Sequence, residues 1–207
     1  MRIGLLGIGR MGLPICGRLL AAGHVVIAFD PLPDRFAAAV ERGARGAASM
    51  RDAAAAADVL ITVLPGPNEL AAAMNGSDGA LAAMPAGAVW IDMTSASAAV
   101  CVPLQQEAAA RGVTALEAPV GGGVRDAGNG TLTFFVGGDA TVLDRHRELL
   151  AALGDRVLHV GGPGAGYTTK LLVNLLWFGQ AVATAEALLL GERAGIDLAV
   201  LRDALAS

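Results

Sequence analysis

The chain has 207 residues, enough for one large domain or for one domain and part of another, with a self-sufficient core. It is 54% hydrophobic but 4% aromatic, and it holds 43 alanines and 28 glycines, so its interior is built from small side chains that allow close backbone approach. The net charge is −4 and the charges are scattered without a basic run, which excludes nucleic acid as an expected partner.

The cysteines and the N-terminus indicate a cytoplasmic protein. Cys16 and Cys101 lie in apolar segments without a histidine or acidic pair at metal-ligand spacing, so we expect two buried free thiols and no metal site. The apolar run at the N-terminus is short and broken by glycines, unlike a signal peptide.

Short apolar segments alternate with helical segments along most of the chain. The sequence predicts strands over residues 3–6, 25–29, 59–64, 89–92, 114–118, 132–137 and 156–160. It predicts helices over residues 11–22, 33–42, 51–57, 68–74, 79–83, 98–111 and 140–153. This alternation is typical of an α/β fold with a doubly wound, Rossmann-type, mostly parallel sheet. The glycine-rich segment 161–166 marks a boundary between a first domain over 1–162 and a helical region over 163–207.

Residues 171–190 form an apolar segment of about the twenty residues that a bilayer-spanning helix needs. Asn174, Gln180, Thr184 and Glu186 interrupt it, and polar groups at that density are costly in lipid. We therefore expect no membrane span but a long helix buried nearly all round by protein. Asp197 is expected to cap one more helix, which reaches the end of the chain.

A glycine motif stands between the first predicted strand and the first predicted helix: Gly7-Ile8-Gly9-Arg10-Met11-Gly12. In a GxGxxG at this place, the first glycine permits the turn, the second lets the backbone approach a pyrophosphate, and the third lets the helix pack on the strand. Asp30 ends the second strand about twenty residues later, where its carboxylate can bind the ribose hydroxyls of NAD. A 2′-phosphate would meet that negative charge, which favours NAD over NADP, although the nearby Arg35 weakens this preference.

Several segments together resemble the β-hydroxyacid dehydrogenase family, which includes 3-hydroxyisobutyrate dehydrogenase and is related to 6-phosphogluconate dehydrogenase. The glycine motif continues into Leu13-Pro14. The other segments follow in the family's order: Leu60-Ile61-Thr62-Val63-Leu64-Pro65, Asp92-Met93-Thr94-Ser95, Glu117-Ala118-Pro119-Val120-Gly121-Gly122-Gly123, and Gly164-Ala165-Gly166-Tyr167-Thr168-Thr169-Lys170-Leu171-Leu172-Val173-Asn174. The resemblance implies that Ser95 contacts the nicotinamide half of the cofactor and that Leu64 and Pro65 line its path.

Lys170, the single lysine in a chain with 14 arginines, is the candidate general acid/base. Oxidation of a hydroxyl by hydride transfer needs a group that removes the alcohol proton, and a partly buried lysine can do this because burial lowers its pKa. Arginine stays protonated and cannot. Asn174 follows four residues later, on the same face of a helix, where it can bind the substrate oxygen or hold the lysine.

Gly121, Gly122 and Gly123 offer successive bare N–H groups, which form a plausible nest for a substrate carboxylate. The resembled family usually has a serine where this chain has Gly121, so the identity of the substrate is open. Ala98 and Glu117 also depart from the family, which commonly has proline and aspartate there; neither change disturbs the mechanism.

The resembled family continues from the long helix into an all-helical domain that completes the active site and makes dimer contacts. Here the sequence ends after the first helix of that region, as in a truncated domain, so we expect a fragment or a short form. An apolar helix needs cover, which predicts a homodimer or larger homo-oligomer through Leu172, Leu176, Leu188 and Leu190. A catalytically impaired dinucleotide-binding module is the rival interpretation; imine or 6-phosphogluconate reductases are others.

Overall fold

The computed structural model describes residues 1–76 and 78–206. The chain divides into two units: one from Met1 to Lys170, and one that begins at Leu171. The first unit holds the sheet.

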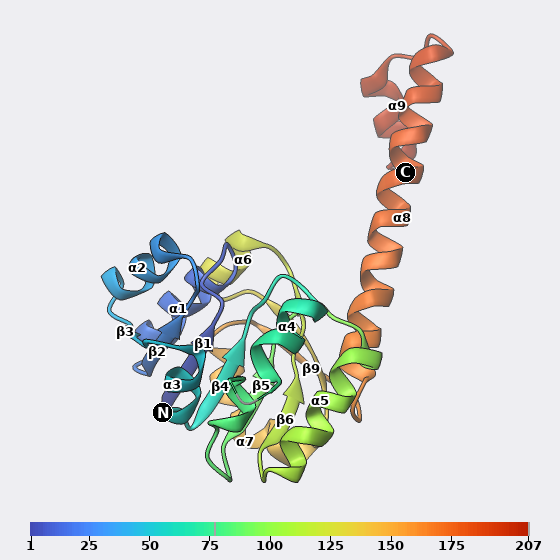
Figure 1. Cartoon of the computed structure of the whole chain (residues 1–207). Helices are drawn as coiled ribbons and strands as arrows, with labels where there is room; N and C mark the ends of the chain where they lie inside the picture. The colour runs from blue at the N-terminus through green and yellow to red at the C-terminus, as the bar shows by residue number, and fades with distance from the viewer. Residues whose placement is uncertain (77, 207) are drawn as a thin grey trace. The chain divides into compact units, whose positions relative to one another are not determined.

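One sheet runs through the first unit (Figure 1). Its strands in the described residues are β1 (Arg2–Leu6), β2 (Val25–Phe29), β3 (Arg45–Gly46), β4 (Val59–Thr62), β5 (Val89–Asp92), β6 (Thr114–Glu117), β7 (Val120–Gly121), β8 (Thr133–Gly137) and β9 (Arg156–Gly161). They lie in the order β3-β2-β1-β4-β5-β6-β8-β7, and β9 pairs with β8. Pairing is parallel from β3 to β6, β8 is antiparallel to β6 and β7, and β9 is parallel to β8. The predicted mostly parallel, Rossmann-type sheet is confirmed.

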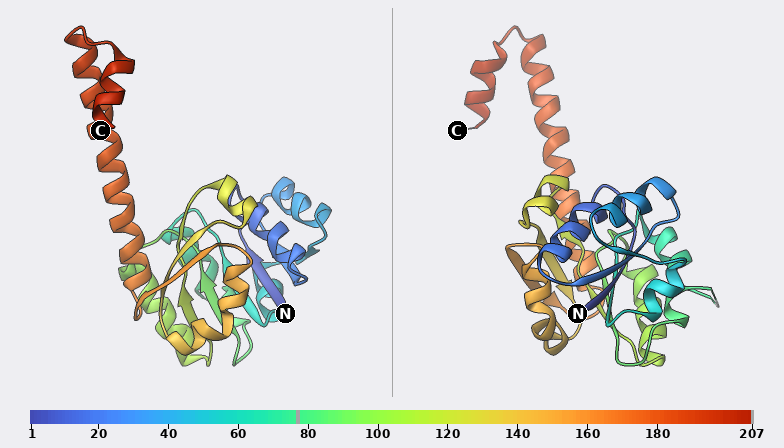
Figure 2. Two further views of the ribbon diagram at one scale, coloured as in Figure 1. Left: turned by 180° about the vertical axis from the view of Figure 1, so that it is seen from behind. Right: turned by 90° about the vertical axis from the view of Figure 1, so that its left-hand side faces the viewer.

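Helices cover both faces of this sheet (Figure 2). One face packs against α1 (Gly12–Ala21), α2 (Pro33–Glu41), α6 (Val124–Asn129) and α7 (Ala140–Ala151). The other packs against α3 (Met50–Ala55), α4 (Pro67–Met74), the 3₁₀ turn η1 (Ala80–Ala82) and α5 (Ala98–Ala110). Two covered faces explain why the central strands are continuous apolar runs: all four residues of β4 and of β5 are buried.

The strand order reverses direction between β1 and β4, and at such a switch point the loops after the parallel strands diverge and leave a crevice. The loops after β1, β2, β4 and β5 carry the glycine motif, Asp30, Leu64 and Thr94. These residues therefore reach one edge of the sheet although they are far apart in the sequence.

Three elements were not predicted: β3, β7 and α6. The run Gly121–Gly123 was expected to be a loop, yet Gly121 ends β7 and Gly123 begins α6 as its N-cap. Asp126 makes this short helix possible because its Oδ2 accepts the Gly123 N–H at 2.7 Å. Gly130 ends α6 with a φ of 74°, a left-handed conformation that suits glycine.

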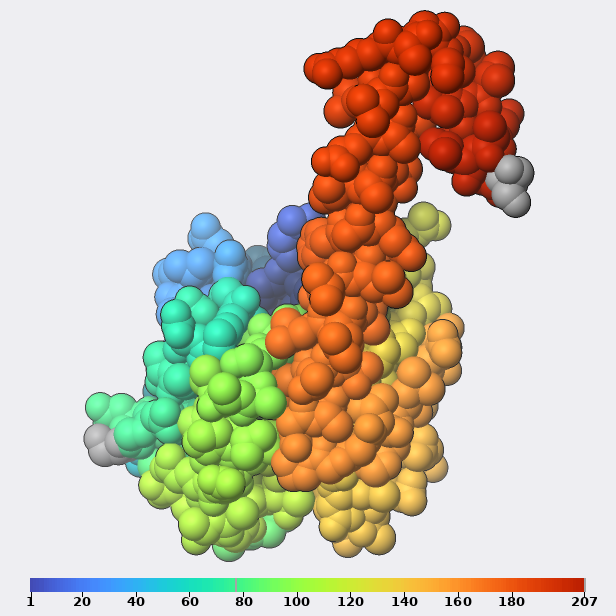
Figure 3. Space-filling view, turned by 90° about the vertical axis from the view of Figure 1, so that its right-hand side faces the viewer, coloured from blue at the N-terminus to red at the C-terminus, as the bar shows by residue number. Residues whose placement is uncertain are grey.

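Two helices account for the second unit. The long helix α8 (Ala165–Arg193) begins inside the segment expected to be a boundary loop, in the first unit, and α9 (Leu198–Leu205) follows it. Asp197 caps α9 as predicted, accepting the N–H of Ala199 at 2.9 Å and that of Val200 at 3.1 Å. The two helices form a hairpin, seen in Figure 2 and as the orange-red and red atoms of Figure 3. The helices approach closely at Gly191, where an added Cβ would overlap Leu201 Cδ2.

The apolar side chains of α8 are largely exposed, for example Leu175 at 70% and Leu190 at 66%. The expectation of a helix buried nearly all round is therefore wrong for this chain, because in its own unit α9 covers the end of α8 and leaves most of its length bare. By length and composition α8 could cross a membrane, which is weak evidence since core helices of soluble proteins pass the same test.

Candidate dinucleotide site and its lysine

The glycine motif forms a tight turn between β1 and α1. A Cβ at Gly7, whose φ is 94°, would overlap the Val63 carbonyl, and a Cβ at Gly12 would overlap the Gly7 carbonyl. Gly9 is different, because the nearest atom to a Cβ there would be an Arg35 guanidinium nitrogen at 3.6 Å. Gly7 and Gly12 thus allow chain segments to touch, whereas Gly9 faces open space into which a ligand can approach.

Asp30 joins the glycine turn to the end of β2. Its carboxylate accepts the Ile8 N–H at 2.8 Å and the Leu32 N–H at 2.9 Å, and the residue is 6% exposed. A carboxylate has about four acceptor positions, so two bonds leave capacity for a ligand's hydroxyls. Asp30 therefore orders the turn and remains an acceptor at its edge.

A cavity of about 680 Å³ lies at this edge of the sheet, within the usual size of a small-molecule site. Nine of the ten predicted cofactor residues line it: Gly7, Gly9, Arg10, Met11, Gly12, Asp30, Leu64, Pro65 and Ser95. The tenth, Ile8, is buried and gives its N–H to Asp30 instead. Lining residues that the sequence analysis did not assign include Met50, Glu69, Met93 and Val120. Met50 and Glu69 lie on helices that follow strands and Met93 follows β5, which was the available signal, whereas Val120 lies in the unpredicted β7.

Asp92, at the end of β5, is the centre of a buried polar network that was not predicted. Its Oδ1 accepts the Thr62 hydroxyl at 2.7 Å and the Thr94 N–H at 3.0 Å, and its Oδ2 accepts the Tyr167 hydroxyl at 2.7 Å. The Trp90 indole N–H bonds Thr62 at 2.9 Å. Burial raises the pKa of Asp92, against the opposing effect of these donors.

Thr94 connects this network to the cavity. Its Oγ1 accepts the Leu64 N–H at 3.2 Å, which ties the loop after β4 to the loop after β5. Leu64 and Ser95, on those two loops, both line the cavity. The hydrogen bonds around Asp92 thus order the walls of the candidate site.

Glu117 holds the start of α8. The side chain is fully buried and accepts N–H groups from Gly164, from Gly166 at 2.9 Å and from Tyr167 at 3.3 Å. Gly166 and Tyr167 bond Oε2, whereas Oε1 accepts the Gly164 N–H and, at 3.0 Å, the side-chain amide of Gln105 on α5. Glu117 was expected to be a harmless departure from the family pattern, but its side chain anchors the helix that carries Lys170.

Lys170 is the last residue of the first unit and is partly buried. Burial lowers the pKa of its amine, as a proton-transfer lysine requires. It is not among the residues that line the dinucleotide cavity. Asn174 lies four residues further along α8, on the same helix face, and belongs to the second unit.

Of the three glycines expected to offer bare N–H groups to a substrate, Gly123 does not. Gly123 was expected to have a bare N–H, but that group donates to Asp126, so it is not free for a substrate carboxylate. Gly122 has a φ of 105° and packs against the Asp126 side chain. Gly121, Gly122 and Gly123 are not among the residues lining the dinucleotide cavity, although the neighbouring Val120 is.

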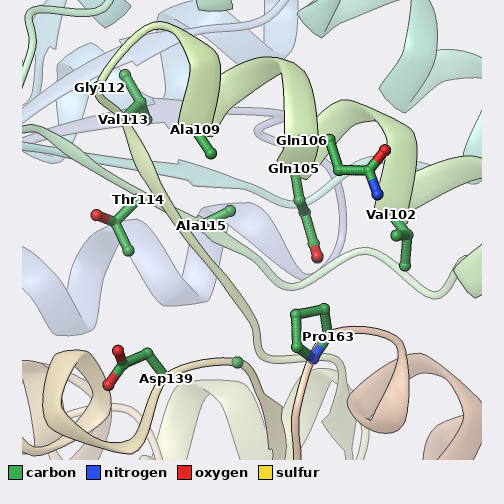
Figure 4. A pocket seen from close by; sticks show the side chains of 11 residues that line it. Val102, Gln105, Gln106, Ala109, Gly112, Val113, Thr114, Ala115, Asp139 and Pro163 are labelled. Atoms are coloured by element: carbon green, nitrogen blue, oxygen red, sulfur yellow. The ribbon is translucent and has the colours of Figure 1, made fainter.

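A second cavity, of about 440 Å³, lies between α5 and the segment that carries Pro163 (Figure 4). Val102, Gln105 and Ala109 from α5 line one side of it, and Asp139 lies near its other end. Two of its polar lining residues already have partners: Gln105 donates to Glu117, and Asp139 accepts N–H groups at the start of α7. Gln106 and Thr114 also line the cavity.

The chain matches two protein-family models and is similar to several known dehydrogenases. Residues 2–161 match a family model described as the NAD binding domain of 6-phosphogluconate dehydrogenase, and residues 164–207 match one described as NAD-binding of NADP-dependent 3-hydroxyisobutyrate dehydrogenase. The 3-hydroxyisobutyrate dehydrogenase of Pseudomonas aeruginosa is 39% identical over 98% of this chain and 68% of its own length. The 2-(hydroxymethyl)glutarate dehydrogenase of Eubacterium barkeri is 38% identical over 95% of this chain and 65% of its own.

A solved structure agrees with these matches. The Mycobacterium tuberculosis 3-hydroxyisobutyrate dehydrogenase with L-serine superposes with a TM-score of 0.89 at 37% identity, covering 95% of this chain and 66% of that one. The chain therefore spans about two thirds of the length of these relatives.

Proposed function

This chain belongs to the β-hydroxyacid dehydrogenase family, and on that premise we propose that it is part of an NAD-dependent oxidoreductase. The reaction is hydride transfer between the cofactor and a small 3-hydroxy acid, or the corresponding semialdehyde. The observation that carries the proposal is the cavity at the switch point, where an open glycine and a buried aspartate meet.

The residues present fit a dinucleotide. The open face of Gly9 gives room for a pyrophosphate at the N-terminus of α1, where unpaired N–H groups favour an anion. Asp30 can accept hydrogen bonds from the adenosine ribose, and Leu64, Pro65 and Ser95 line the same cavity. The bound cofactor would accept or supply the hydride.

NAD is the proposed cofactor because of the charge of Asp30. A 2′-phosphate on the ribose would face a carboxylate that is already fixed by two N–H bonds. Arg10 and Arg35 line the same cavity, and their positive charges favour the 2′-phosphate of NADP. Comparison of the two dissociation constants tests the choice: NAD is expected to bind more tightly than NADP, and the opposite order contradicts it.

Lys170 is the proposed general acid/base, with Asn174 orienting the substrate oxygen or the lysine. A partly buried amine whose pKa is lowered can take the alcohol proton in oxidation and return it in reduction. Lys170→Ala is expected to abolish turnover while NADH binding survives, measured by absorbance at the reduced cofactor's band and by fluorescence. Unchanged turnover would rule out this role.

The proposed substrate carries a carboxylate. The relatives are named for 3-hydroxyisobutyrate and 2-(hydroxymethyl)glutarate, which combine a hydroxyl and a carboxylate. Gly121 and Gly122 are the proposed contacts for that carboxylate, Gly123 being occupied by Asp126. Because a glycine replaces the family's usual serine, we propose only the class of 3-hydroxy acids.

A catalytically impaired dinucleotide-binding module is the rival, and the loss of the Gly123 N–H to Asp126 favours it. A screen of NAD and NADP reduction across small 3-hydroxy acids distinguishes the two. The dehydrogenase proposal requires turnover of at least one acid that Lys170→Ala abolishes. Cofactor binding without turnover of any acid, also in a longer form of the protein, supports the binding module.

We also propose that copies of this chain associate through α8, as a soluble, cytoplasmic homo-oligomer. Leu172 is 60% exposed and Leu176 is 64% exposed. Burial of these apolar side chains against a second copy of the helix would lower the free energy. A C2 dimer is the commonest way to provide it.

A further inference from the structure

Two buried carboxylates of the first unit hold the start of α8. Glu117 accepts three of the N–H groups around the first turn, which a helix start leaves without partners inside the helix. Gln105 adds a fourth donor from α5. Four donors converging on a fully buried carboxylate make a built anchor, since an unpaired buried charge would be strongly unfavourable.

The backbone around Glu117 is shaped to admit its carboxylate. A Cβ at Gly137 would overlap Glu117 Oε2, and a Cβ at Gly166 would lie 2.9 Å from the same oxygen and 2.6 Å from the Phe135 carbonyl. Any larger residue at either position would displace the carboxylate or the helix. Strand β8 and helix α8 therefore both have glycine where the Glu117 side chain passes between them.

Tyr167 provides a second tie, by a different route. Its side chain is fully buried and its hydroxyl donates to Asp92 Oδ2 at 2.7 Å. The same aspartate accepts the Thr94 N–H, and Thr94 accepts the Leu64 N–H. The hydrogen bonds that order two loops of the dinucleotide cavity thus continue into α8.

The hydrogen bonds to Glu117 and to Asp92 both reach α8 within one turn of Lys170. Residues three and four apart are neighbours on a helix face, and helical side chains lean toward the N-terminus, so Lys170 lies over Tyr167 and Gly166. These are the two α8 residues that give their N–H groups to Glu117. The first compact unit ends at Lys170, so the anchored part of the helix includes the lysine.

We propose that Glu117 and the Asp92–Tyr167 pair are positioning residues for Lys170, fixing its amine in relation to the dinucleotide cavity. The inference rests on the proposed function of Lys170 as the proton-transfer residue. A displacement of about 1 Å in a reacting group can cost on the order of 100-fold in rate. Loss of either tie is therefore expected to lower kcat rather than weaken dinucleotide binding.

Two variants of the full chain test this, with two matched controls. Glu117→Gln keeps the side-chain size but turns an NH₂ group toward backbone donors, and Tyr167→Phe removes only the hydroxyl that reaches Asp92. Asp139→Asn weakens the cap of a different helix, α7, and Leu150→Ala removes a fully buried side chain of α7. The controls show what a lost helix cap or a lost core contact does when α8 is untouched.

Lys170 permits a readout that does not need turnover. It is the only lysine, so labelling of amines by acetic anhydride followed by peptide mass spectrometry reports one ε-amine. The pH of half-maximal labelling follows the pKa of that amine, which burial lowers. Release of the helix start exposes the amine to water, and this pH is then expected to rise toward the ordinary value of 10.5.

The expected result is a rise in the half-labelling pH for Glu117→Gln and a smaller one for Tyr167→Phe. Where turnover is present, kcat falls by about 100-fold in Glu117→Gln while the dinucleotide KM stays close to that of the unchanged chain. Both controls retain the unchanged labelling profile. If Glu117→Gln does not fold, Tyr167→Phe alone decides.

A labelling profile and kcat that match the unchanged chain in a folded variant overturn the inference, even if the melting temperature falls. Failure of the proposed function looks different: the unchanged chain, or a longer form of it, then has no turnover or loses none in Lys170→Ala. The labelling profile remains informative in that case.

Discussion

Two glycines of the motif, Gly9 and Gly12, are expected to respond in opposite ways to the same substitution. In Gly9→Ala the new methyl lies 3.6 Å from the flexible Arg35 side chain, and Gly9 does not have a positive φ. Alanine fits such a site, and the unfolded chain loses freedom, so stability is expected to rise by about 0.4–1 kcal/mol. In Gly12→Ala the methyl overlaps the Gly7 carbonyl, and overpacking of that kind costs about 1–3 kcal/mol.

Thermal unfolding with and without NAD converts these energies into temperatures. In a chain of this length each 1 kcal/mol moves the melting temperature by about 2–4 °C. Gly9→Ala is expected to melt about 1–4 °C higher than the unchanged chain, and Gly12→Ala about 2–12 °C lower. Added NAD at about 100 times its Kd contributes roughly 2.7 kcal/mol, or about 5–11 °C, in the unchanged chain.

The decisive observation is the response of Gly9→Ala to NAD. If the open face of Gly9 receives the pyrophosphate, its methyl occupies the ligand's place and most of the NAD-dependent gain disappears although the protein itself is more stable. A Gly9→Ala variant that keeps the full gain would refute the placement of the pyrophosphate. A Gly12→Ala variant as stable as the unchanged chain would refute the close approach of α1 to β1.

Three further predictions concern Lys170, Asp30 and α8. Lys170→Met is expected to raise the free energy of unfolding in urea at neutral pH, because burial disfavours the charged ammonium of Lys170 in the folded state. This gain should vanish as the pH rises toward 10.5, where the amine is neutral in the unfolded state as well. A gain that stays constant with pH contradicts the prediction. Asp30→Asn is expected to lower the free energy of unfolding by about 1–3 kcal/mol, because an amide cannot accept both the Ile8 and Leu32 N–H groups as the carboxylate does. In a titration, the same substitution is expected to weaken the binding of NAD more than that of NADP. Light scattering after size exclusion at micromolar concentration is expected to show a dimer or larger assembly, and Leu176→Glu is expected to disrupt that assembly. A monodisperse monomer of the unchanged chain contradicts the proposed association.

Local patterns predicted most of the fold and the dinucleotide residues. The glycine motif and Asp30 are recognisable because each residue type meets one local structural requirement. Gly7 has a positive φ, Gly9 faces open space, and Asp30 provides a hydrogen-bond acceptor directly after β2. Alternating strands and helices then place them at one sheet edge. The misses are short elements, such as the two-residue β3, in which no periodicity can develop.

The polar interior could not be predicted in the same way. Glu117 and Gly166 are 49 residues apart, and Asp92 and Tyr167 are 75 apart, so their pairing depends on the sheet order. The antiparallel entry of β8 beside β6 gives no local signal, yet it brings Gly137 against Glu117. Asp126 and Gly123 are a different case, because they are only three residues apart. The aspartate converts an apparently open glycine run into a helix cap, and its spacing was a local signal that went unused.

The high glycine and alanine content acquires a more specific meaning from these contacts. A small-residue interior lets a parallel sheet and its helices approach closely, and at Gly137 and Gly166 a carboxylate fills the space together with packed backbone. The adjustment of size is mutual: a methyl at either glycine would push the carboxylate away from the first N–H groups of α8. Composition and charge therefore act together here. The buried carboxylate of Glu117 can accept the first N–H groups of α8 only because Gly137 and Gly166 beside it have no side chains. As a result, Lys170 on α8 is held on the dinucleotide-binding unit.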